Sequence, residues 1–481
     1  MEIRGDDVNG KISKIGSFAL AAVFFLSAFV AIVGSADVQG QGTSNWLVNK
    51  VEREEGVTDK LGGGNYVAVK FGNDSWFAVI YGTQEHPNSI VICSITQRYL
   101  GAAKVVNQNG NVIFEQAPIR VQTVYALRLS TIYEFNDSNE NGICDIERTA
   151  SNDVDYIEHE HIFKRAPLWG AWTLSSINDT ISNDNKTRTL EFSLTRTDIE
   201  YKRYLFTVPG IKLEKVQFNF KLKAELVEVN GVSYPTYVVT VASDPVQKYK
   251  VTKSEEGPTK TFNGTVAKYT VKADHIIEGW DFAENNTNPY LLLETQAIVA
   301  NHVGEGVSKW GQAQFMKNET NGTANMETDN GTMALGTDSS SDEGNSTGLP
   351  KRMYNHPRIE LKDKWNRLGH FTWVTKVNVT KNGVTEEKNM YYQIQGAFKF
   401  LYGSPGTTSF LKGFVIIGGF SYPGGDLIYH DPEMGAENTL PYIIEKSPTS
   451  PKKGRLPGFE AIGLLAALGV ASIVLLSRKR I

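Results

Sequence analysis

Apolar and polar side chains alternate along several long stretches of this chain. The clearest case is residues 215–222, where every second residue is apolar and the residues between them are Lys, Gln or Asn. Successive side chains of a β-strand point to opposite faces, so this pattern predicts a half-buried antiparallel strand of the kind found in sandwiches. Residues 44–135 contain no ten-residue stretch with a convincing helical period.

Further β-branched and aromatic runs predict more strands, separated by turns rich in Gly, Asn and Pro. Lys381-Asn382-Gly383-Val384 is the clearest hairpin among them. The fold class expected is all-β: antiparallel β-sandwich domains in tandem, with one N-terminal and one C-terminal hydrophobic helix. The other predicted strands are 65–70, 75–81, 89–95, 112–114, 121–135, 189–194, 204–208, 237–241, 265–271, 291–299, 358–362, 368–378, 388–401 and 410–420.

An apolar run at residues 17–36 follows Lys11 and Lys14 and ends in Gly34-Ser35-Ala36. Basic residues, an apolar core and small residues at its end predict a signal peptide cleaved after Ala36. The alternative is an uncleaved N-terminal anchor, because about seventeen apolar residues are nearly enough to span a bilayer.

A second apolar run, residues 461–476, carries no charge and is followed by Arg478-Lys479-Arg480. Pro457-Gly458-Phe459 stands just before it. Together these residues resemble the PGF-type C-terminal sorting signal of archaeal cell-surface (S-layer-like) glycoproteins. The resemblance implies that an archaeosortase-type enzyme removes the helix and joins the new C-terminus to a lipid. It also implies a cell-surface location, with an extracellular ectodomain anchored to the cytoplasmic membrane.

Composition shifts divide the remaining chain. Residues 313–348 are dominated by Asn, Thr, Ser, Gly, Asp and Glu, too polar to offset the entropy of ordering. The predicted segments are a signal peptide (1–36), a β-rich domain with an Asp/Asn loop (37–165), a β-sandwich domain (166–312), a disordered glycosylated acidic segment (313–351), a β-rich domain that could complete the preceding sandwich (352–442), a tether (443–456) and the sorting signal (457–481).

The formal net charge of −4 argues against a nucleic-acid-binding surface. The resemblance of the C-terminal segment implies that the membrane and the archaeosortase-type processing enzyme are partners, together with other envelope proteins or further copies of this chain.

One local motif carries metal chemistry. Residues 137–145 place Asp137, Asn139, Asn141 and Asp145 at positions 1, 3, 5 and 9 of a loop resembling an EF-hand calcium loop, and Ile143 could add its carbonyl oxygen. The motif departs from the EF-hand because position 12 is arginine. A weak extracellular-type Ca²⁺ site is the prediction, and an Asx-rich hairpin turn is the alternative.

The chain has two cysteines, Cys93 and Cys144. In an exported protein they could pair as a disulfide. Because each stands among apolar neighbours, two buried thiols are the alternative.

Asn-x-Ser/Thr sequons recur along the chain and cluster in the acidic segment. One sequon alone is a weak signal, but with export and anchoring they predict a glycoprotein. A glycan at the sequon beside the Asp/Asn loop would crowd the metal site, so those two predictions compete. The sequon asparagines are Asn73, Asn136, Asn178, Asn185, Asn263, Asn285, Asn318, Asn321, Asn330, Asn345 and Asn378.

The sequence contains no Gly-x-Ser-x-Gly elbow, His-Glu-x-x-His motif, Walker loop or dinucleotide fingerprint. We therefore expect no enzyme, but a structural or interaction protein of the archaeal envelope, S-layer-like or S-layer-associated. The alternative is a surface adhesin or ligand-binding protein. An exported glycoside hydrolase is a weaker third possibility, because its two carboxylates need only converge in space.

Overall fold

The structure is a computed structural model that describes residues 46–50, 65–71, 75–144, 160–203, 206–244, 248–303, 323–328, 331–335, 353–354, 358–362, 367–402 and 410–436. Every regular element in these ranges is a β-strand, which confirms the all-β expectation. Within them no helix has the length and apolar character needed to cross a bilayer. The two expected terminal helices lie outside the described residues.

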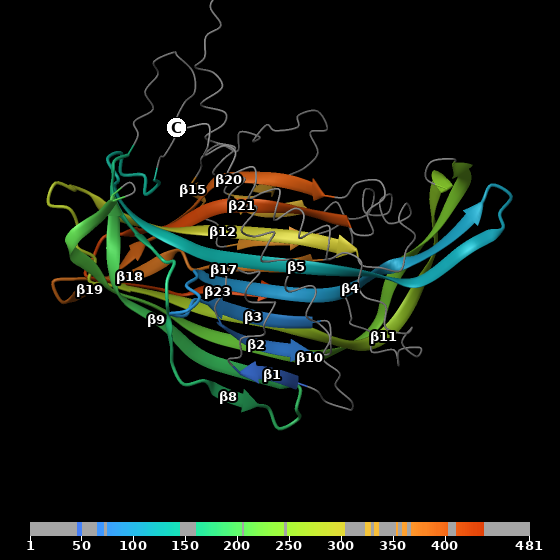
Figure 1. Cartoon of the computed structure of the whole chain (residues 1–481), viewed down its shortest axis with the longest axis horizontal. Coiled ribbons are helices and arrows are strands. Elements are labelled where there is room, and N and C mark those ends of the chain that lie inside the picture. The colour runs from blue at the N-terminus through green and yellow to red at the C-terminus, as the bar shows by residue number, and fades with distance from the viewer. Residues whose placement is uncertain are drawn as a thin grey trace, which may run out of the picture.

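Nine strands form one antiparallel layer (Figure 1). In spatial order they are β1 (Trp46–Lys50), β2 (Asn65–Phe71), β3 (Ser75–Tyr81), β4 (Ile90–Asn107), β5 (Val112–Asn136), β12 (Pro289–Val303), β21 (Phe410–Pro423), β20 (Tyr391–Tyr402) and β15 (Met353–Tyr354).

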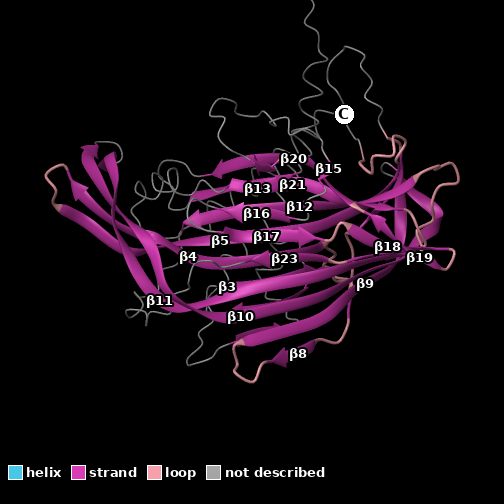
Figure 2. Ribbon diagram, turned by 180° about the vertical axis from the view of Figure 1, so that it is seen from behind, coloured by secondary structure: helices cyan, strands magenta, loops and turns pink. Residues whose placement is uncertain are grey.

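The second layer can be followed from behind in Figure 2. Its central strands are β9 (Thr187–Arg203), β10 (Phe206–Asp244) and β11 (Lys248–Glu278), with β7 (Thr173–Leu174) and β8 (Asn178–Ile181) on the outer side of β9. Beyond β11 the layer divides into two branches. In the first, β11 pairs with β22 (Leu427–His430), followed by β18 (Lys376–Lys381) and β19 (Val384–Asn389). In the second, β11 pairs with β23 (Pro432–Ala436), followed in order by β17 (Arg367–Trp373), β16 (Arg358–Lys362), β13 (Thr323–Thr328) and β14 (Gly331–Leu335).

Two connections join the layers at their sides. Strand β6 (Ile162–Pro167) pairs with β5 and meets β9 at Arg165 and Lys202. Farther along, the long strands β4 and β10 run parallel to each other over Ala102–Asn107 and Thr236–Val241. The β4–β5 and β10–β11 ribbons extend beyond the body of the sandwich at this end (Figure 1).

The two layers enclose one core. Phe77 of β3 stacks on Tyr269 of β11 with ring centroids 6.1 Å apart, and Trp373 of β17 lies 4.8 Å from Tyr392 of β20. The apolar positions of 215–222 are all buried, as their alternation predicts. Each buried aromatic or aliphatic side chain contributes about 1.5–3 kcal/mol relative to exposure, so this shared core is the main source of stability.

The tandem arrangement of sandwich domains is not confirmed. Strand β5, from the first expected domain, pairs with β12 from the second, and β12 pairs with β21 from the third. Side chains from all three segments lie in the same core cluster. Alternation along a strand predicts which side chains face the core, but it does not identify the neighbouring strand.

Part of the expected disordered segment, 313–351, is strand. The β13–β14 hairpin lies within it, and β13 also pairs with β16. The short runs at 323–328 and 331–335 contain methionine, alanine and leucine between polar residues of the sequence. β14 pairs only locally with β13 in the described part of the chain, whereas β13 also pairs with the distant β16. The polar average composition of residues 313–351 does not reveal these two short strands.

Of the two alternatives for the cysteines, the structure shows the buried thiols: Cys93 and Cys144 are buried and form no disulfide with each other. Cys93 lies opposite Ala126 of β5, whereas Cys144 packs with Phe135 near the end of β5. Nine residues of extended strand separate these positions, roughly 30 Å, far beyond the reach of a disulfide. Burial raises the pKa of the Cys93 thiol to about 12, which makes it unreactive.

A chain of polar groups crosses the apolar core. His275 Nδ1 lies 2.9 Å from the Tyr422 hydroxyl, which lies 3.1 Å from His430 Nδ1, and His430 Nε2 lies 3.0 Å from the Val374 carbonyl oxygen. Since a carbonyl only accepts, His430 Nε2 donates to Val374. Burial lowers the pKa of both imidazoles and so favours their neutral forms, and the Nδ1 of a neutral His430 accepts from the Tyr422 hydroxyl.

Acid should therefore weaken the fold. Burial lowers the pKa of His430 from 6.5 to about 4, and burial together with the His430 charge lowers that of His275 well below 6.5. The unfolded chain binds more protons in this window, so stability is lost as pH falls from about 6.5 towards 4, by at most about 3 kcal/mol for His430. Melting temperatures between pH 7 and 4 test this. His430→Gln should flatten the dependence and exposed His161→Gln should not; equal slopes in all three proteins would contradict the prediction.

Candidate functional site

The predicted calcium loop follows β5, and its own backbone N–H groups donate hydrogen bonds to the Asp137 carboxylate. Asp137 is almost fully buried, and its carboxylate accepts hydrogen bonds from the Asn141 N–H at 3.0 Å and the Gly142 N–H at 2.9 Å. Glu140 and Gly142 have positive φ angles of 57° and 74°, which reverse the chain around this carboxylate. The loop is thus an Asx-type turn, the alternative raised by the sequence.

The other described oxygen ligands also cap backbone groups. Asn139 Oδ1 accepts from the Asn141 N–H at 3.2 Å, and Asn141 Oδ1 accepts from the Ile143 N–H at 2.7 Å. A carboxamide or carboxylate oxygen keeps a second lone pair when it accepts one hydrogen bond, so these contacts leave room for weak cation coordination. Asp145 lies outside the described residues.

Among the described residues no three His, Cys, Asp or Glu side chains gather in a group that could hold a metal ion. Of the predicted ligands, the described side chains supply one carboxylate, that of Asp137, plus the two carboxamides of Asn139 and Asn141. These three side chains fit a weak calcium site of the extracellular class.

The loop is anchored at both ends. The Asp137 N–H donates to the Asn288 carbonyl oxygen at 3.0 Å, and Asn288 Nδ2 donates to the Asp137 carbonyl oxygen at 2.7 Å. At the other end the Gln393 carboxamide exchanges two hydrogen bonds with the Cys144 backbone, at 2.7 and 3.0 Å. Any Cβ at Gly142 would lie 2.1 Å from the Tyr391 ring, so glycine is needed there for both space and conformation.

A hollow of about 540 Å³ lies beside this loop. Tyr391, which contacts Gly142, lines it together with three lysines, Lys376, Lys381 and Lys388. Lysine ammonium groups repel a divalent cation, so a calcium ion would have to be held by the loop alone.

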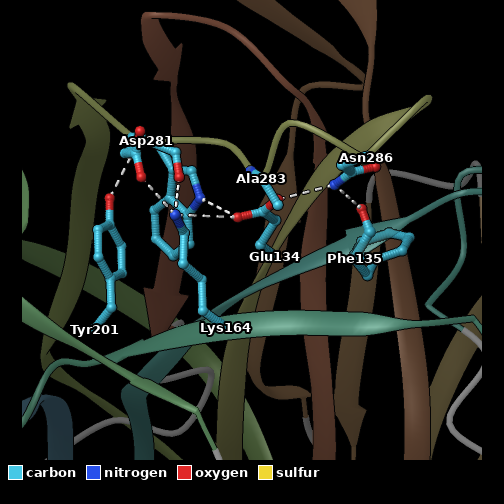
Figure 3. Close-up of polar contacts among 8 residues, drawn as sticks. Glu134, Phe135, Lys164, Tyr201, Asp281, Ala283 and Asn286 are labelled. Carbon is cyan, nitrogen blue, oxygen red and sulfur yellow. Dashed lines mark hydrogen bonds and ion pairs between the residues drawn. The ribbon is translucent and has the colours of Figure 1, made fainter. Parts of the chain in front are cut away.

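Shortly before the loop, Glu134 of β5 forms a buried polar hub (Figure 3). Its side chain is fully buried and accepts three hydrogen bonds: from Trp280 Nε1 at 3.0 Å, the Ala283 N–H at 2.8 Å and Asn286 Nδ2 at 3.0 Å. All three donors lie in the connection that crosses from β11 in one layer to β12 in the other. Glu134 therefore fixes that crossing.

Lys164 of β6 balances this buried charge. Its ammonium lies 3.7 Å from Glu134 Oε2 and 2.9 Å from Asp281 Oδ2, and it also donates to the Asp281 carbonyl oxygen. It stands over the Tyr201 ring, 4.4 Å from the centroid, while the Tyr201 hydroxyl accepts from the Asp281 N–H (Figure 3). The sequence did not indicate this hub, because Glu134 appears there as one acid between the apolar residues of a strand.

Two further carboxyl groups are perturbed. Burial raises the pKa of Glu294, and burial together with the neighbouring Asp431 raises that of Asp274. Neither carboxyl lines the hollow beside the loop or the second hollow, described below.

The described sequon asparagines differ in accessibility. Asn178, Asn185, Asn285 and Asn378 are exposed on turns, loops or short strands. Asn136 is different, because its Oδ1 accepts from Thr287 Oγ1 at 3.2 Å and from the Asn288 N–H at 2.9 Å. The side chain of Asn263 and all of Asn73, Asn318, Asn321, Asn330 and Asn345 lie outside the described residues.

Comparisons of this chain with known protein families, with curated proteins and with solved structures find no match.

Removing Glu134 should lower the stability of the fold, because the buried ammonium of Lys164 then keeps only Asp281 as an ion-pair partner among the described residues. We expect Glu134→Ala to destabilise the fold by about 3–5 kcal/mol in chemical denaturation. Glu134→Leu combined with Lys164→Met should cost less than the sum of the two single changes. The control is Lys223→Met, which removes the exposed ion pair with Glu225 at 3.0 Å and should cost about 0–1 kcal/mol. If the double variant loses as much stability as the two single variants together, Glu134 and Lys164 are not coupled and the proposed hub is contradicted.

Calcium should raise the melting temperature of the wild-type protein relative to chelator, since an ion that binds only the folded state stabilises it. Asp137→Ala should lower the melting temperature in both conditions and abolish the calcium-dependent rise. Asp184 provides a matched control, because it caps an exposed turn by accepting from the Lys186 N–H at 3.0 Å. Asp184→Ala should keep the calcium response, and identical melting with and without chelator would exclude the site.

Proposed function

We propose that this chain is an exported, membrane- or lipid-anchored archaeal cell-surface glycoprotein with a structural or interaction role in the envelope, S-layer-like or S-layer-associated. The observation that carries the proposal is the C-terminal sequence: Pro457-Gly458-Phe459, the uncharged apolar run 461–476 and the basic residues after it. Together with the leader at 17–36, this sequence supports an extracellular location of the β-rich chain.

The exposure of the sequon asparagines supports the proposal that the protein is glycosylated. Four of the described sequon asparagines are exposed, and they stand on separate elements of the sandwich. An oligosaccharide needs an accessible carboxamide and room around it, and these four positions offer both. Calcium in the loop after β5 would serve as a weak structural ligand of this surface protein.

The partners of such a protein are the membrane, an archaeosortase-type processing enzyme, and neighbouring envelope proteins or further copies of the chain. An adhesive or ligand-binding role is the second candidate, favoured by a polar hollow near Arg196.

Mass spectrometry of the protein from native envelopes tests the proposal. We expect a mature N-terminus near residue 37, loss of the apolar run 461–476 that follows Pro457-Gly458-Phe459, a lipid at the new C-terminus, and glycans at Asn178, Asn185, Asn285 and Asn378. Asn136 should remain unmodified, because its carboxamide is held within the fold. A chain that still ends at Ile481 and carries no glycan would overturn the proposal.

A lattice role makes a separate prediction. A lattice protein should be abundant in envelope fractions, and the purified protein should assemble into sheets when calcium is added. A scarce protein that stays monomeric under these conditions would argue for the accessory or adhesive role instead.

A further inference from the structure

A second hollow, of about 830 Å³, lies at the side of the sandwich between the turn after β3 and the strands β7 and β9. Residues 83–86 form one wall, Thr195 and Thr197 of β9 form another, and Trp172 and Arg196 line it between them. These residues are widely separated in the sequence, and only the pairing of the strands brings them together.

The walls of this hollow are fixed by the backbone. The Thr83 N–H donates to the His86 carbonyl oxygen at 2.9 Å, and the His86 N–H donates back to Thr83 Oγ1 at 3.1 Å. Gly82 approaches the next segment so closely that a Cβ would lie 2.0 Å from the Gly170 carbonyl oxygen. The shape therefore exists before any ligand arrives, which reduces the entropic cost of binding.

Arg196 is the unusual group here. Its Nη1 donates to the Pro167 carbonyl oxygen at 2.9 Å, and its guanidinium lies against Gly170. Burial lowers the pKa of Arg196, and within the described part of the chain no carboxylate forms an ion pair with it. By contrast, Arg188 on the same strand is held by Asp179 through Nε at 2.9 Å and through Nη2. A partly buried cation without an anion is costly, and an arriving anion removes that cost.

The rest of the lining is polar. Gln84 and Glu85 are exposed on the turn, Asn65 stands at the start of β2, and Thr195 and Thr197 add hydroxyl groups. The amides and hydroxyls among them both donate and accept hydrogen bonds, and the Glu85 carboxylate accepts, so together they offer partners for the hydroxyl groups of a sugar. The hollow is also within the size range of small-ligand sites.

We propose that this hollow binds an acidic carbohydrate. The carboxylate of a uronic-acid residue lies on the planar fork of Arg196, and the sugar hydroxyls meet the wall of Gln84, Glu85 and the threonines. A guanidinium pairs with a planar carboxylate through two parallel hydrogen bonds, which fixes the orientation of the sugar. This inference depends on the hollow alone and holds whether or not the protein is anchored as proposed.

Calorimetric titration of the purified full chain tests it with four probes: a glucuronic-acid disaccharide, the neutral glucose disaccharide of the same linkage, acetate and inorganic phosphate. The uronate should bind with a dissociation constant in the millimolar range or below, and each of the other three at least ~10-fold more weakly. Arg196→Gln should weaken uronate binding by at least ~10-fold. The matched control is Arg203→Gln, an exposed arginine on the same strand, which should bind as the wild type does.

A second variant covers the case in which Arg196→Gln does not fold. Thr197 is exposed on the wall, so Thr197→Tyr should fill the hollow, keep the melting temperature and abolish binding. The proposal is overturned if the uronate does not bind, if the neutral sugar binds equally well, or if acetate or phosphate alone binds as tightly. Uronate binding unaffected by both variants overturns it too. None of these results alters the processing and glycan pattern by which the proposed function is judged.

Discussion

The sandwich depends on one buried carboxylate, Glu134. The connection between β11 and β12 must pass from one layer to the other, and a crossing chain leaves backbone groups that no ladder satisfies. Glu134 accepts the Ala283 N–H of that chain together with the side chains of Trp280 and Asn286, and Lys164 keeps its charge balanced. Hydrophobic burial stabilises each layer against the other, whereas this hub determines how the chain passes between them.

The same hub positions the loop that follows β5. Asn288, at the end of the crossing, holds both the N–H and the carbonyl oxygen of Asp137. A change at Glu134 therefore reaches the candidate calcium loop through the backbone, without any direct contact with its oxygens. Stability and metal binding are expected to be coupled at this end of the sandwich, and the hollow near Arg196 is built on different turns.

The sequence predicts the local level of this structure well. Alternation marks the buried side of residues 215–222, and Asn382-Gly383 predicts the hairpin turn, where both residues have positive φ. It does not predict that β10 continues from Phe206 to Asp244, because the turn residues Asn230-Gly231 fall inside this long strand at an irregularity of the ladder. Pairing between distant segments, such as β5 with β12, leaves no periodic trace in either one.

In the candidate sites, too, the sequence predicts the local features but not the contacts between distant segments. The Asp/Asn spacing at 137–141 correctly marks a loop in which side-chain oxygens organise the backbone, since Asx turns and calcium loops share that local geometry. The hub at Glu134 and the hollow at Arg196 could not be found in this way. Their residues come from four or more separate strands and turns, and a charged residue within a strand has the same appearance in sequence whether it is solvated or buried.

The position of β23 has a mechanical consequence. This last described strand is not at an edge: it pairs with β11 over Tyr269–Lys272 on one side and with β17 over His370–Trp373 on the other. A pull applied through the C-terminal side of the chain must break two ladders at once before β23 can leave the fold. A peripheral strand would peel away one hydrogen bond at a time, whereas β23 distributes the load across both neighbours.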